Sequence, residues 1–390
     1  MKSLKSIFSL FLCFIVLNTT SLLAQNDPIA QSMAVANESV STATDKTIKV
    51  ALLLDTSNSM DGLIDQAKAQ LWDIVNELAM AKCENQKPNL QIALYEYGND
   101  NLPASEGHIR QVLGFSDDLD DISGKLFSLT TNGGNEFCGQ VIQSSLKQLE
   151  WGNNAKDLKL IFIAGNEPFT QGTVSYKSAA ELANGKDVTI NTIYCGNFEA
   201  GIRESWKNGA DLTKGEYMAI DQNKVSVQIP SPYDDAILEC NNRLNTTYIP
   251  YGEVGYDKMQ NQKIQDSNAQ GYSNANAVKR TISKSSHFYK NSSWDLVDAE
   301  QEKDFSYQKI KKDQLPEELR GKSIEELKVL VEQKRAERQT IQNEIQTLNT
   351  KRVEYVNEQK KLNNTINGLE NAMISAIKKQ AAKKNYKWED

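Results

Sequence analysis

Histidine is scarce in this chain, with only His108 and His287 among 390 residues. Neither stands in a segment with recognisable catalytic partners, so we interpret both as surface or loop residues rather than general bases. The sequence also lacks a phosphate-binding glycine motif, a zinc-ligand spacing and the serine motif of a nucleophile elbow. These absences argue against nucleotide-dependent and hydrolytic enzymes.

Long apolar runs are missing beyond the first 24 residues. That first stretch has Lys2 and Lys5, a short apolar core at 7–16 and small residues before Gln25, which is the pattern of a secretory signal peptide. The apolar core is too short for a membrane span, and no later run approaches membrane length. We therefore expect cleavage after Ala24 and an exported product, periplasmic or secreted, without a transmembrane segment.

Basic residues are fewer than acidic ones. The chain has 44 Lys and Arg against 51 Asp and Glu, a formal net charge of −7. This balance argues against general nucleic-acid binding. Residues 25–46 are small and polar without periodicity, which predicts a disordered linker.

From Thr47 onward, strand and helix patterns alternate. Strands are predicted at 48–54, 90–97, 109–115, 158–164, 188–194 and 217–220, and helices at 63–81, 119–129, 139–149, 175–183, 199–211 and 233–245. This alternation is typical of an α/β fold with a doubly wound, mostly parallel six-stranded sheet (Rossmann-like) covered by helices on both faces. The second and third strands are joined by a short loop without a helix, so they can be antiparallel.

A candidate site follows the first strand, in the segment KVALLLDTSNSM at 49–60. The apolar run ends at Asp55, and Ser57 and Ser59 follow before an amphipathic helix. One carboxylate and two hydroxyls therefore meet at the carboxyl end of a strand, where open α/β sheets bind ligands. Such oxygen ligands suit Mg²⁺ or Mn²⁺. The alternative is a capping cluster that satisfies free N–H groups at the start of the helix.

The D-x-S-x-S triplet in this setting resembles the metal-ion-dependent adhesion site (MIDAS) of von Willebrand factor type A (VWA) domains. The resemblance covers roughly residues 47–248 and implies that two more loops complete a metal site. In the loop TTNGGNEF at 130–137, Asn135 stands where these domains usually have a threonine, with Thr130 and Thr131 nearby.

The other implied loop is IAGNEPF at 163–169, where Gly165 takes the position of an aspartate. Asn166 and Glu167 are then the nearest oxygen donors. The candidate metal ligands are Asp55, Ser57, Ser59, Thr131, Asn135 and Glu167.

The resemblance implies binding or adhesion rather than catalysis. A cation held on the triplet would coordinate an Asp or Glu carboxylate of a protein partner. Two alternatives remain: a metal-free structural or assembly protein that acts through a C-terminal coiled coil, and an exported hydrolase. A VWA domain with a signal peptide and such a tail resembles exported bacterial proteins.

The tail has its own pattern. Residues 249–317 form a polar connector with weak helical periodicity, and from 318 to 390 apolar residues recur in heptads, which predicts a long helix or coiled coil. A lone helix cannot hide such a stripe, so a second copy of the chain, the helix at 257–285 or a foreign protein must cover it. Arg338 and Arg352 in the stripe disfavour a parallel dimer, and we expect self-association in another arrangement.

Four cysteines remain after the expected cleavage, and an even count in an exported chain suggests disulfides, with free buried thiols as the alternative. If the fold is as predicted, Cys83 and Cys240 end neighbouring helices on one side of the sheet. Cys138 and Cys195 lie on the opposite, ligand-bearing side. The expected bridges are Cys83–Cys240 and Cys138–Cys195.

Overall fold

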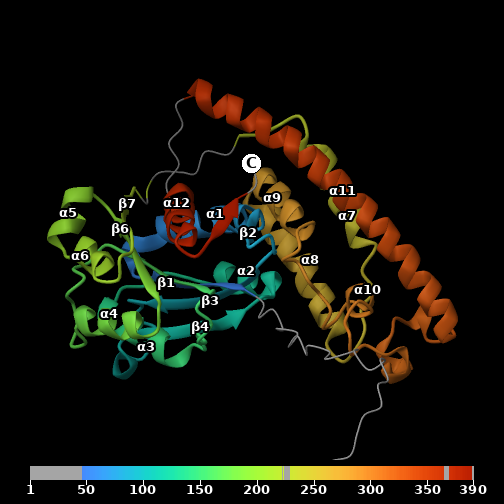
Figure 1. Cartoon of the computed structure of the whole chain (residues 1–390), viewed down its shortest axis with the longest axis horizontal. Coiled ribbons are helices and arrows are strands. Elements are labelled where there is room, and N and C mark those ends of the chain that lie inside the picture. Colours follow the sequence, from blue (N-terminus) through green and yellow to red (C-terminus); the bar gives the residue numbers. More distant parts are fainter. Residues whose placement is uncertain (1–45, 222, 224–228, 364–368, 389–390) are drawn as a thin grey trace, which may run out of the picture. The chain divides into compact units, whose positions relative to one another are not determined.

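A mixed six-stranded sheet lies at the centre of the fold (Figure 1). The computed structural model describes residues 46–221, 223, 229–363 and 369–388, so the expected signal peptide and nearly all of the predicted linker lie outside the described residues. The strand order is β4-β3-β1-β5-β6-β7. The strands are β1 (Thr47–Asp55), β3 (Asn89–Tyr97), β4 (Ile109–Ser116), β5 (Leu158–Gly165), β6 (Thr189–Cys195) and β7 (Tyr217–Ile220).

Strand pairing confirms the predicted fold class. β1 pairs in parallel with β3 and β5, β5 with β6, and β6 with β7, whereas β3 and β4 are antiparallel. Every residue of β5, LKLIFIAG, is buried, as expected for a central strand of a sheet covered on both faces. The carboxyl ends of β1, β3 and β5 lie at the same edge of the sheet, and Asp55 is in register with Tyr97.

Helices cover both faces of the sheet (Figure 1). On one face, α1 (Asp61–Leu78) and α2 (Leu119–Phe127) pack on Val50, Leu54 and Leu160. On the other, α3 (Cys138–Gln148), α4 (Tyr176–Gly185) and α6 (Trp206–Asp211) pack on Ala51, Leu53 and Ile161. Successive side chains of β1 point to opposite faces of the sheet and therefore contribute to two separate cores.

The helix predicted at 199–211 is two helices, α5 (Phe198–Arg203) and α6. Ser205, which lies between them, has a φ of 70°. That left-handed conformation interrupts the helical hydrogen-bond ladder, and its cost is offset by Trp206, which is fully buried against Phe169 and Tyr194.

The connector is folded and packs on the sheet domain. After α7 (Asp234–Asn245) come α8 (Gly255–Tyr272), α9 (Asn274–Lys284) and α10 (Leu296–Ala299), followed by single turns at Tyr307–Lys309, Lys312–Gln314 and Glu317–Leu319. Helix α9 lies against α1 and α7, and α8 lies against α2. Leu296, Val297 and Leu315 form a small further core with the start of the next helix.

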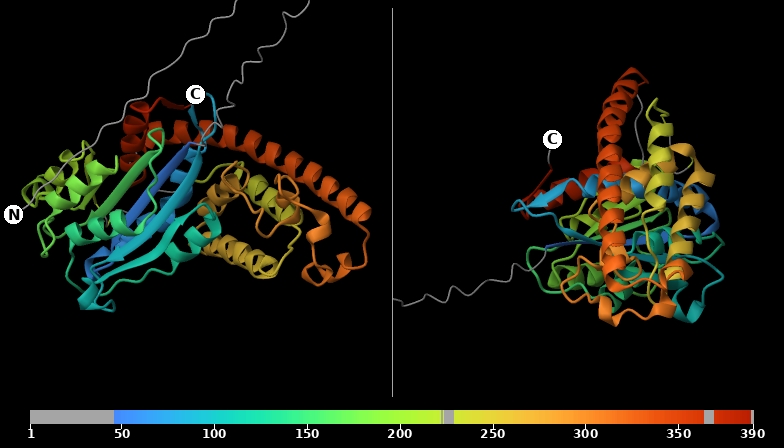
Figure 2. Two further views of the ribbon diagram at one scale, coloured as in Figure 1. Left: turned by 60° about the horizontal axis from the view of Figure 1, so that its bottom comes forward. Right: turned by 90° about the vertical axis from the view of Figure 1, so that its right-hand side faces the viewer.

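The C-terminal region is helical, as predicted, but the described residues form two helices rather than one unbroken helix over 318–390. The described residues form α11 (Ile324–Asn363) and α12 (Leu369–Ala382), which pack in different places, and the five residues between them lie outside the described residues. Helix α11 runs along α7 (Figure 2), and its heptad positions Val331, Ile341 and Ile345 are buried against the same chain. The pattern correctly indicated a buried stripe, and its own chain covers it.

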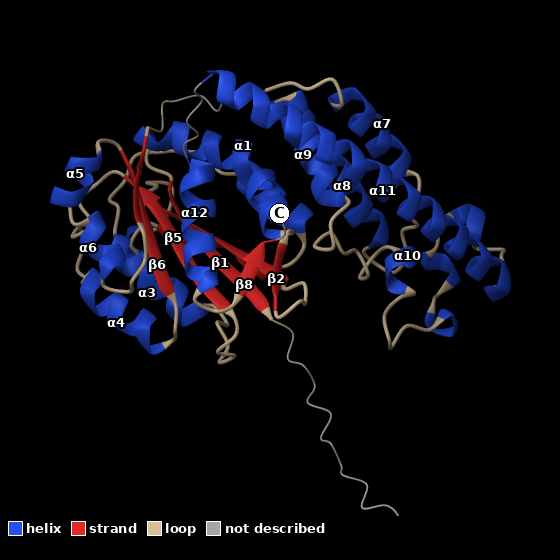
Figure 3. Cartoon of the chain, turned by 45° about the horizontal axis from the view of Figure 1, so that its top comes forward, coloured by secondary structure: helices blue, strands red, loops and turns tan. Residues whose placement is uncertain are grey.

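Helix α12 covers the sheet face beside α1, with Ile377 fully buried. After it, β8 (Tyr386–Trp388) pairs antiparallel with β2 (Ala81–Cys83), and the two short strands lie side by side in Figure 3. The Trp388 indole donates to the Glu77 carbonyl at 3.1 Å. The last described residues are thus part of the fold.

The expected disulfides are absent: Cys83, Cys138, Cys195 and Cys240 are free and buried. The predicted arrangement failed because the end of the chain lies on Cys83, whose thiol is 3.6 Å from the Lys384 carbonyl oxygen. The Cys138 thiol instead lies 3.8 Å from the Tyr97 hydroxyl.

Among the described helices, none is both long and apolar enough to cross a bilayer.

Candidate functional site

Asp55 ends β1 at the carboxyl edge of the sheet, and its side chain is fully buried. Its Oδ1 accepts a hydrogen bond from the Ser57 backbone N–H at 2.8 Å, and the Ser57 and Ser59 hydroxyl oxygens are 3.3 Å apart. The chain turn after β1 therefore brings the predicted triplet together. Ser57, which precedes the turn at Asn58–Met60, makes no side-chain cap, and neither does Met60 before α1.

The loop at 130–137 approaches Asp55 through a different residue from the one expected. Asn135 is exposed, and the Thr131 hydroxyl donates to Asp61. Glu136, next to Asn135, is instead buried, with only 5% of its surface accessible. The loop lies so close to the end of β3 that a Cβ at Gly98 would stand 2.6 Å from Glu136 Cγ and 2.8 Å from Asp55 Oδ1. Glu136 and Asp55 therefore face the same small space.

The loop after β5 supplies the third side of this space. The Asn166 amide donates to the Ser59 hydroxyl at 3.2 Å, whereas Glu167 is half-buried and its backbone carbonyl accepts from the Trp206 indole at 2.8 Å. A Cβ at Gly165 would lie 2.5 Å from the Tyr97 hydroxyl and 3.0 Å from Asp55 Oδ2. An aspartate at Gly165 has no room here, and this explains the glycine.

The two buried carboxylates of this site have raised pKa values. Burial raises the pKa of Asp55 to about 7 against the opposing hydrogen bonds from Ser57, and the Glu167 carboxylate adds to the rise. Burial, and after it the Asp55 carboxylate, raise the pKa of Glu136 to about 8. Asp55 Oδ2, Glu136 Oε2 and Asn166 Oδ1 are buried without a hydrogen-bond partner. Burial of this kind favours a proton or a cation on the two carboxylates, and the amide oxygen is free to accept from a donor or to bind a cation.

These residues fit a hard divalent cation. Two buried carboxylates, the Ser57 and Ser59 hydroxyls and the Asn166 amide oxygen offer the donors that Mg²⁺ and Mn²⁺ prefer. Within the described ranges, no group of three His, Cys, Asp or Glu side chains is arranged around one metal position. A cation at this site would therefore depend on neutral oxygens as well as on carboxylates.

Sequence reasoning missed Glu136. It placed Asn135 by counting from the glycine pair Gly133-Gly134, but a one-residue difference decides which neighbouring side chain turns inward. The only available clue was chemical, because Glu136 is the sole carboxylate in that loop.

A comparison with protein families identifies one domain in this chain. Residues 49–204 match the model of the von Willebrand factor type A domain family. No curated protein matches the chain.

Solved structures with similarity to this chain include the following three. Proximal thread matrix protein 1 from the mussel byssus, described with a zinc-occupied MIDAS motif, shares 16% identity over 46% of this chain and 43% of its own, with a TM-score of 0.35. BatB from Bacteroides thetaiotaomicron shares 16% over 45% and 90%, with a TM-score of 0.34. The SpRpn10 VWA domain shares 16% over 44% and 87%, with a TM-score of 0.32.

This chain thus spans less than half the length of the mussel protein. The matched residues include the sheet from β1 to β6 and the loops that carry Asp55, Glu136 and Glu167, whereas β7 lies beyond them. The chain contains a von Willebrand factor type A domain, at residues 49–204.

Proposed function

We propose that this protein is a non-catalytic binding module that captures a protein partner at the carboxyl edge of its sheet. The observation that carries the proposal is the pair of buried carboxylates, Asp55 and Glu136, whose unpartnered oxygens face one space between three loops. Neither of the chain's two histidines, His108 and His287, lies in these three loops. Binding is therefore favoured over hydrolysis.

The proposed cofactor is a divalent cation, Mg²⁺ or Mn²⁺, held by Asp55, Glu136, Ser57 and Ser59. Such an ion neutralises the carboxylates and ties the loops after β1, α2 and β5 together. Loops at the end of a rigid sheet are where binding proteins carry their specificity. The proposed location, periplasmic or secreted, rests on the predicted signal peptide in the sequence.

The alternative of a metal-free assembly protein that acts through its coiled coil has less support. The heptad positions of α11 are occupied by contacts within the same chain, and Arg338 and Arg352 are paired with Asp295 and Asp234. A second copy would have to displace these contacts. Self-association through α11 stays a prediction, which sedimentation equilibrium tests.

Calorimetric titration of residues 25–390 with Mg²⁺, Mn²⁺ and Ca²⁺ tests the cation. We expect Asp55→Ala to abolish binding and Glu136→Gln to weaken it about tenfold or more, since each removes a carboxylate that faces the ion. Asn135→Ala is the matched control, because this exposed neighbour should leave the affinity unchanged. Equal losses in the Asn135 and Glu136 variants would contradict the assignment, as would binding that survives without Asp55.

A further inference from the structure

The loop that carries Glu136 contains an asparagine followed directly by a glycine, Asn132-Gly133. Residues 129–137 form neither helix nor strand, so the Gly133 N–H is not held in a regular hydrogen-bond ladder. It donates instead to Oδ1 of Asn132 at 3.0 Å. The side chain of Asn132 is therefore folded back onto the peptide bond that follows it.

This arrangement brings together the atoms that an asparagine needs in order to cyclise. The attacking atom is the Gly133 nitrogen, and the attacked atom is Asn132 Cγ, which carries the Oδ1 that this N–H contacts. Glycine has no side chain to hinder the approach. The Asn132 side chain is half-buried, and its Nδ2 donates to Asn101 Oδ1 at 3.0 Å in an exposed contact. Ammonia can therefore leave and water can enter.

Two other Asn-Gly pairs lie in the described residues, and both are helical; the fourth pair of the sequence, at 367–368, lies outside them. Asn184-Gly185 ends α4, and Asn208-Gly209 lies in α6, where the Gly209 N–H donates to the Ser205 carbonyl at 2.9 Å. Both helical asparagines are more exposed than Asn132. Solvent exposure alone would thus predict that they react first, whereas the backbone geometry favours Asn132.

We propose that Asn132 converts spontaneously to aspartate and isoaspartate, and that this conversion alters the candidate cation site. The Gly133 nitrogen bonds to Asn132 Cγ, the Cγ–Nδ2 bond breaks, and Nδ2 leaves as ammonia with the proton of the Gly133 N–H. Water then opens the five-membered imide at one of its two carbonyls. Attack at Cγ gives aspartate, and attack at the main-chain carbonyl carbon gives isoaspartate, in which the main chain runs through Cβ and Cγ.

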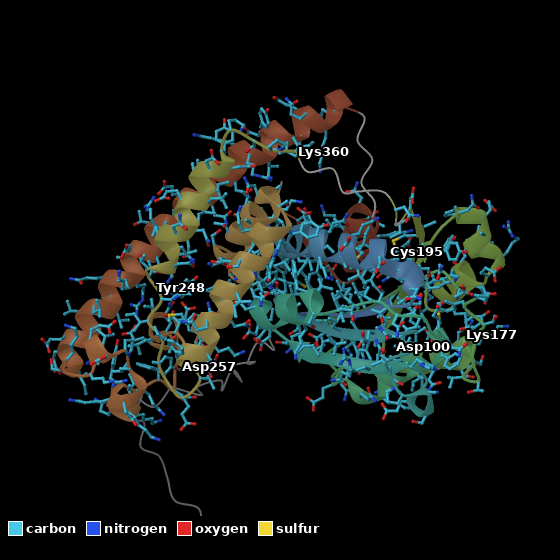
Figure 4. All side chains as sticks on the ribbon, turned by 180° about the vertical axis from the view of Figure 1, so that it is seen from behind. Asp100, Lys177, Cys195, Tyr248, Asp257 and Lys360 are labelled. Atoms are coloured by element: carbon cyan, nitrogen blue, oxygen red, sulfur yellow. The ribbon has the colours of Figure 1, made fainter. Side chains whose placement is uncertain are left out.

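Isoaspartate lengthens the main chain by one atom at a point where the loop is held on both sides. The Asn132 N–H donates to the Thr56 carbonyl at 3.0 Å, and the Gly133 carbonyl accepts from the Asp100 N–H at 2.5 Å. Figure 4 labels Asp100 on the sheet domain. The added atom lies between these two contacts, so both cannot keep their geometry, and Glu136 shifts within the candidate site. This consequence rests on the proposed cation site.

Peptide mapping of residues 25–390 tests the conversion. The protein is incubated for several days at mildly alkaline pH and digested with trypsin, which places the three asparagines on separate peptides, 126–147, 178–186 and 208–214. We expect the first peptide to gain about 1 Da, the difference between an amide and an acid, on the order of tenfold faster than the other two. In urea, where the backbone geometry is lost, the three should react at similar rates.

Gly133→Ala is the matched variant. The atom nearest to a Cβ at Gly133 would be Asn58 Nδ2 at 3.4 Å, an ordinary contact, so the fold tolerates the change. The added methyl group hinders the attack and should slow the conversion about tenfold or more. Asn135→Ala changes the same peptide without touching the reacting pair, and it should keep the wild-type rate.

Calorimetric titration with Mg²⁺ then measures the consequence. The isoaspartyl form, separated by chromatography, should bind about tenfold more weakly than fresh protein, and incubated Gly133→Ala should match its fresh counterpart.

Three results would overturn the conversion: no gain of mass at Asn132, equal rates at the three asparagines of the folded protein, or an unchanged rate in Gly133→Ala. Equal Mg²⁺ affinity of the isoaspartyl and fresh proteins would overturn its effect on the site. The mass measurement does not depend on a cation, so fresh protein that binds no Mg²⁺ counts against the proposed function and leaves the conversion standing.

Discussion

Two regions of this protein contain buried ionisable groups. In one region these groups lack counter-charges, and in the other they form ion pairs. At the carboxyl edge, Asp55 and Glu136 are buried together without a positive partner, and their pKa values are raised. Where α8 and α9 meet the sheet domain, Asp120 and Asp266 are also buried or nearly so, but Arg280 lies between them at 2.8 Å and 2.7 Å.

The second region is balanced charge for charge. Lys284, fully buried, adds a second cation 3.0 Å from Asp266 and donates to Asn245 at 2.6 Å. These cations lower the pKa of Asp266, although burial alone would raise it. We call Arg280, Lys284, Asp120 and Asp266 the ionic joint. This difference indicates the role of each region. The paired charges hold neighbouring elements together, whereas the unpaired carboxylates are suited to a cation that the chain itself does not supply.

Removal of the tail leaves buried carboxylates without their ion-pair partners. It should have the largest effect on the stability of the fold. A chain ending at Pro316 lacks Arg338, which pairs with Asp295 and Asp298, and Arg352, which pairs with Asp234. It also lacks α12, which covers α1 and β5. We expect this chain to aggregate or to lose cooperative unfolding, monitored by circular dichroism during thermal denaturation. A stable, cooperative domain would show that the tail is an independent unit.

Breaking the ionic joint itself should be the largest single-residue effect. Arg280→Met leaves Asp120 and Asp266 buried with Lys284 alone, and we expect a loss of about 3–5 kcal/mol in the free energy of unfolding. Urea denaturation measures it. Lys311→Met is the control: its ammonium is exposed and 3.9 Å from Glu253, so the change should stay within about 0.5 kcal/mol.

The unpaired cluster should respond to pH in the opposite sense to the ionic joint. The folded state holds the Asp55 proton more tightly than the unfolded state, whose pKa is about 3.9, so cation-free protein loses stability as pH rises from about 4 to about 7. Asp55→Asn lacks this loss. Its free energy of unfolding, relative to that of the wild type, should therefore rise by about 2 kcal/mol between pH 5 and pH 8.

Asp266→Asn provides the opposite sign. Because the folded pKa of Asp266 is lowered, its stabilisation is present above the unfolded pKa and is lost as pH falls. The deficit of Asp266→Asn relative to wild type should therefore be full at pH 7 and shrink below about pH 4. Parallel pH profiles for the two variants would remove the distinction between the regions.

The smallest expected effect comes from the glycine that lets Asp55 sit at the end of β1. Gly165→Ala places a Cβ against the Tyr97 hydroxyl and Asp55 Oδ2, and we expect a loss of about 1–2 kcal/mol with weaker cation binding. Gly185→Ala is the matched control, since a Cβ at Gly185 meets nothing within 4 Å. Thermal denaturation with and without Mg²⁺ compares the two.

The sequence was enough to predict the sheet, because its central strands are short apolar runs such as LKLIFIAG, each ending at a turn. It also placed Asp55, Ser57 and Ser59 correctly, since a strand followed directly by a helix fixes where the intervening residues lie. Glu136 was missed because the twist of a glycine-containing loop decides whether it or Asn135 points inward.

The tail could be predicted only in part. A heptad pattern reports that one side of a helix is buried and carries no information about what buries it. Arg338 in the middle of the stripe looked unfavourable, but its partners Asp295 and Asp298 lie some 40 residues away in the sequence. The disulfide prediction failed for the same reason, because the position of Cys83 depends on the far end of the chain.

The pairing of β8 with β2 sets an order of events in folding. The Trp388 indole and the Glu77 carbonyl that it contacts are 311 residues apart in the chain. Contacts of such long range form late, because a large loop must close before they contribute. Synthesis of Tyr386–Trp388 must therefore precede closure of this side of the sheet domain. A chain that has not yet been synthesised as far as Trp388 lacks this pairing and leaves β2 without its partner strand.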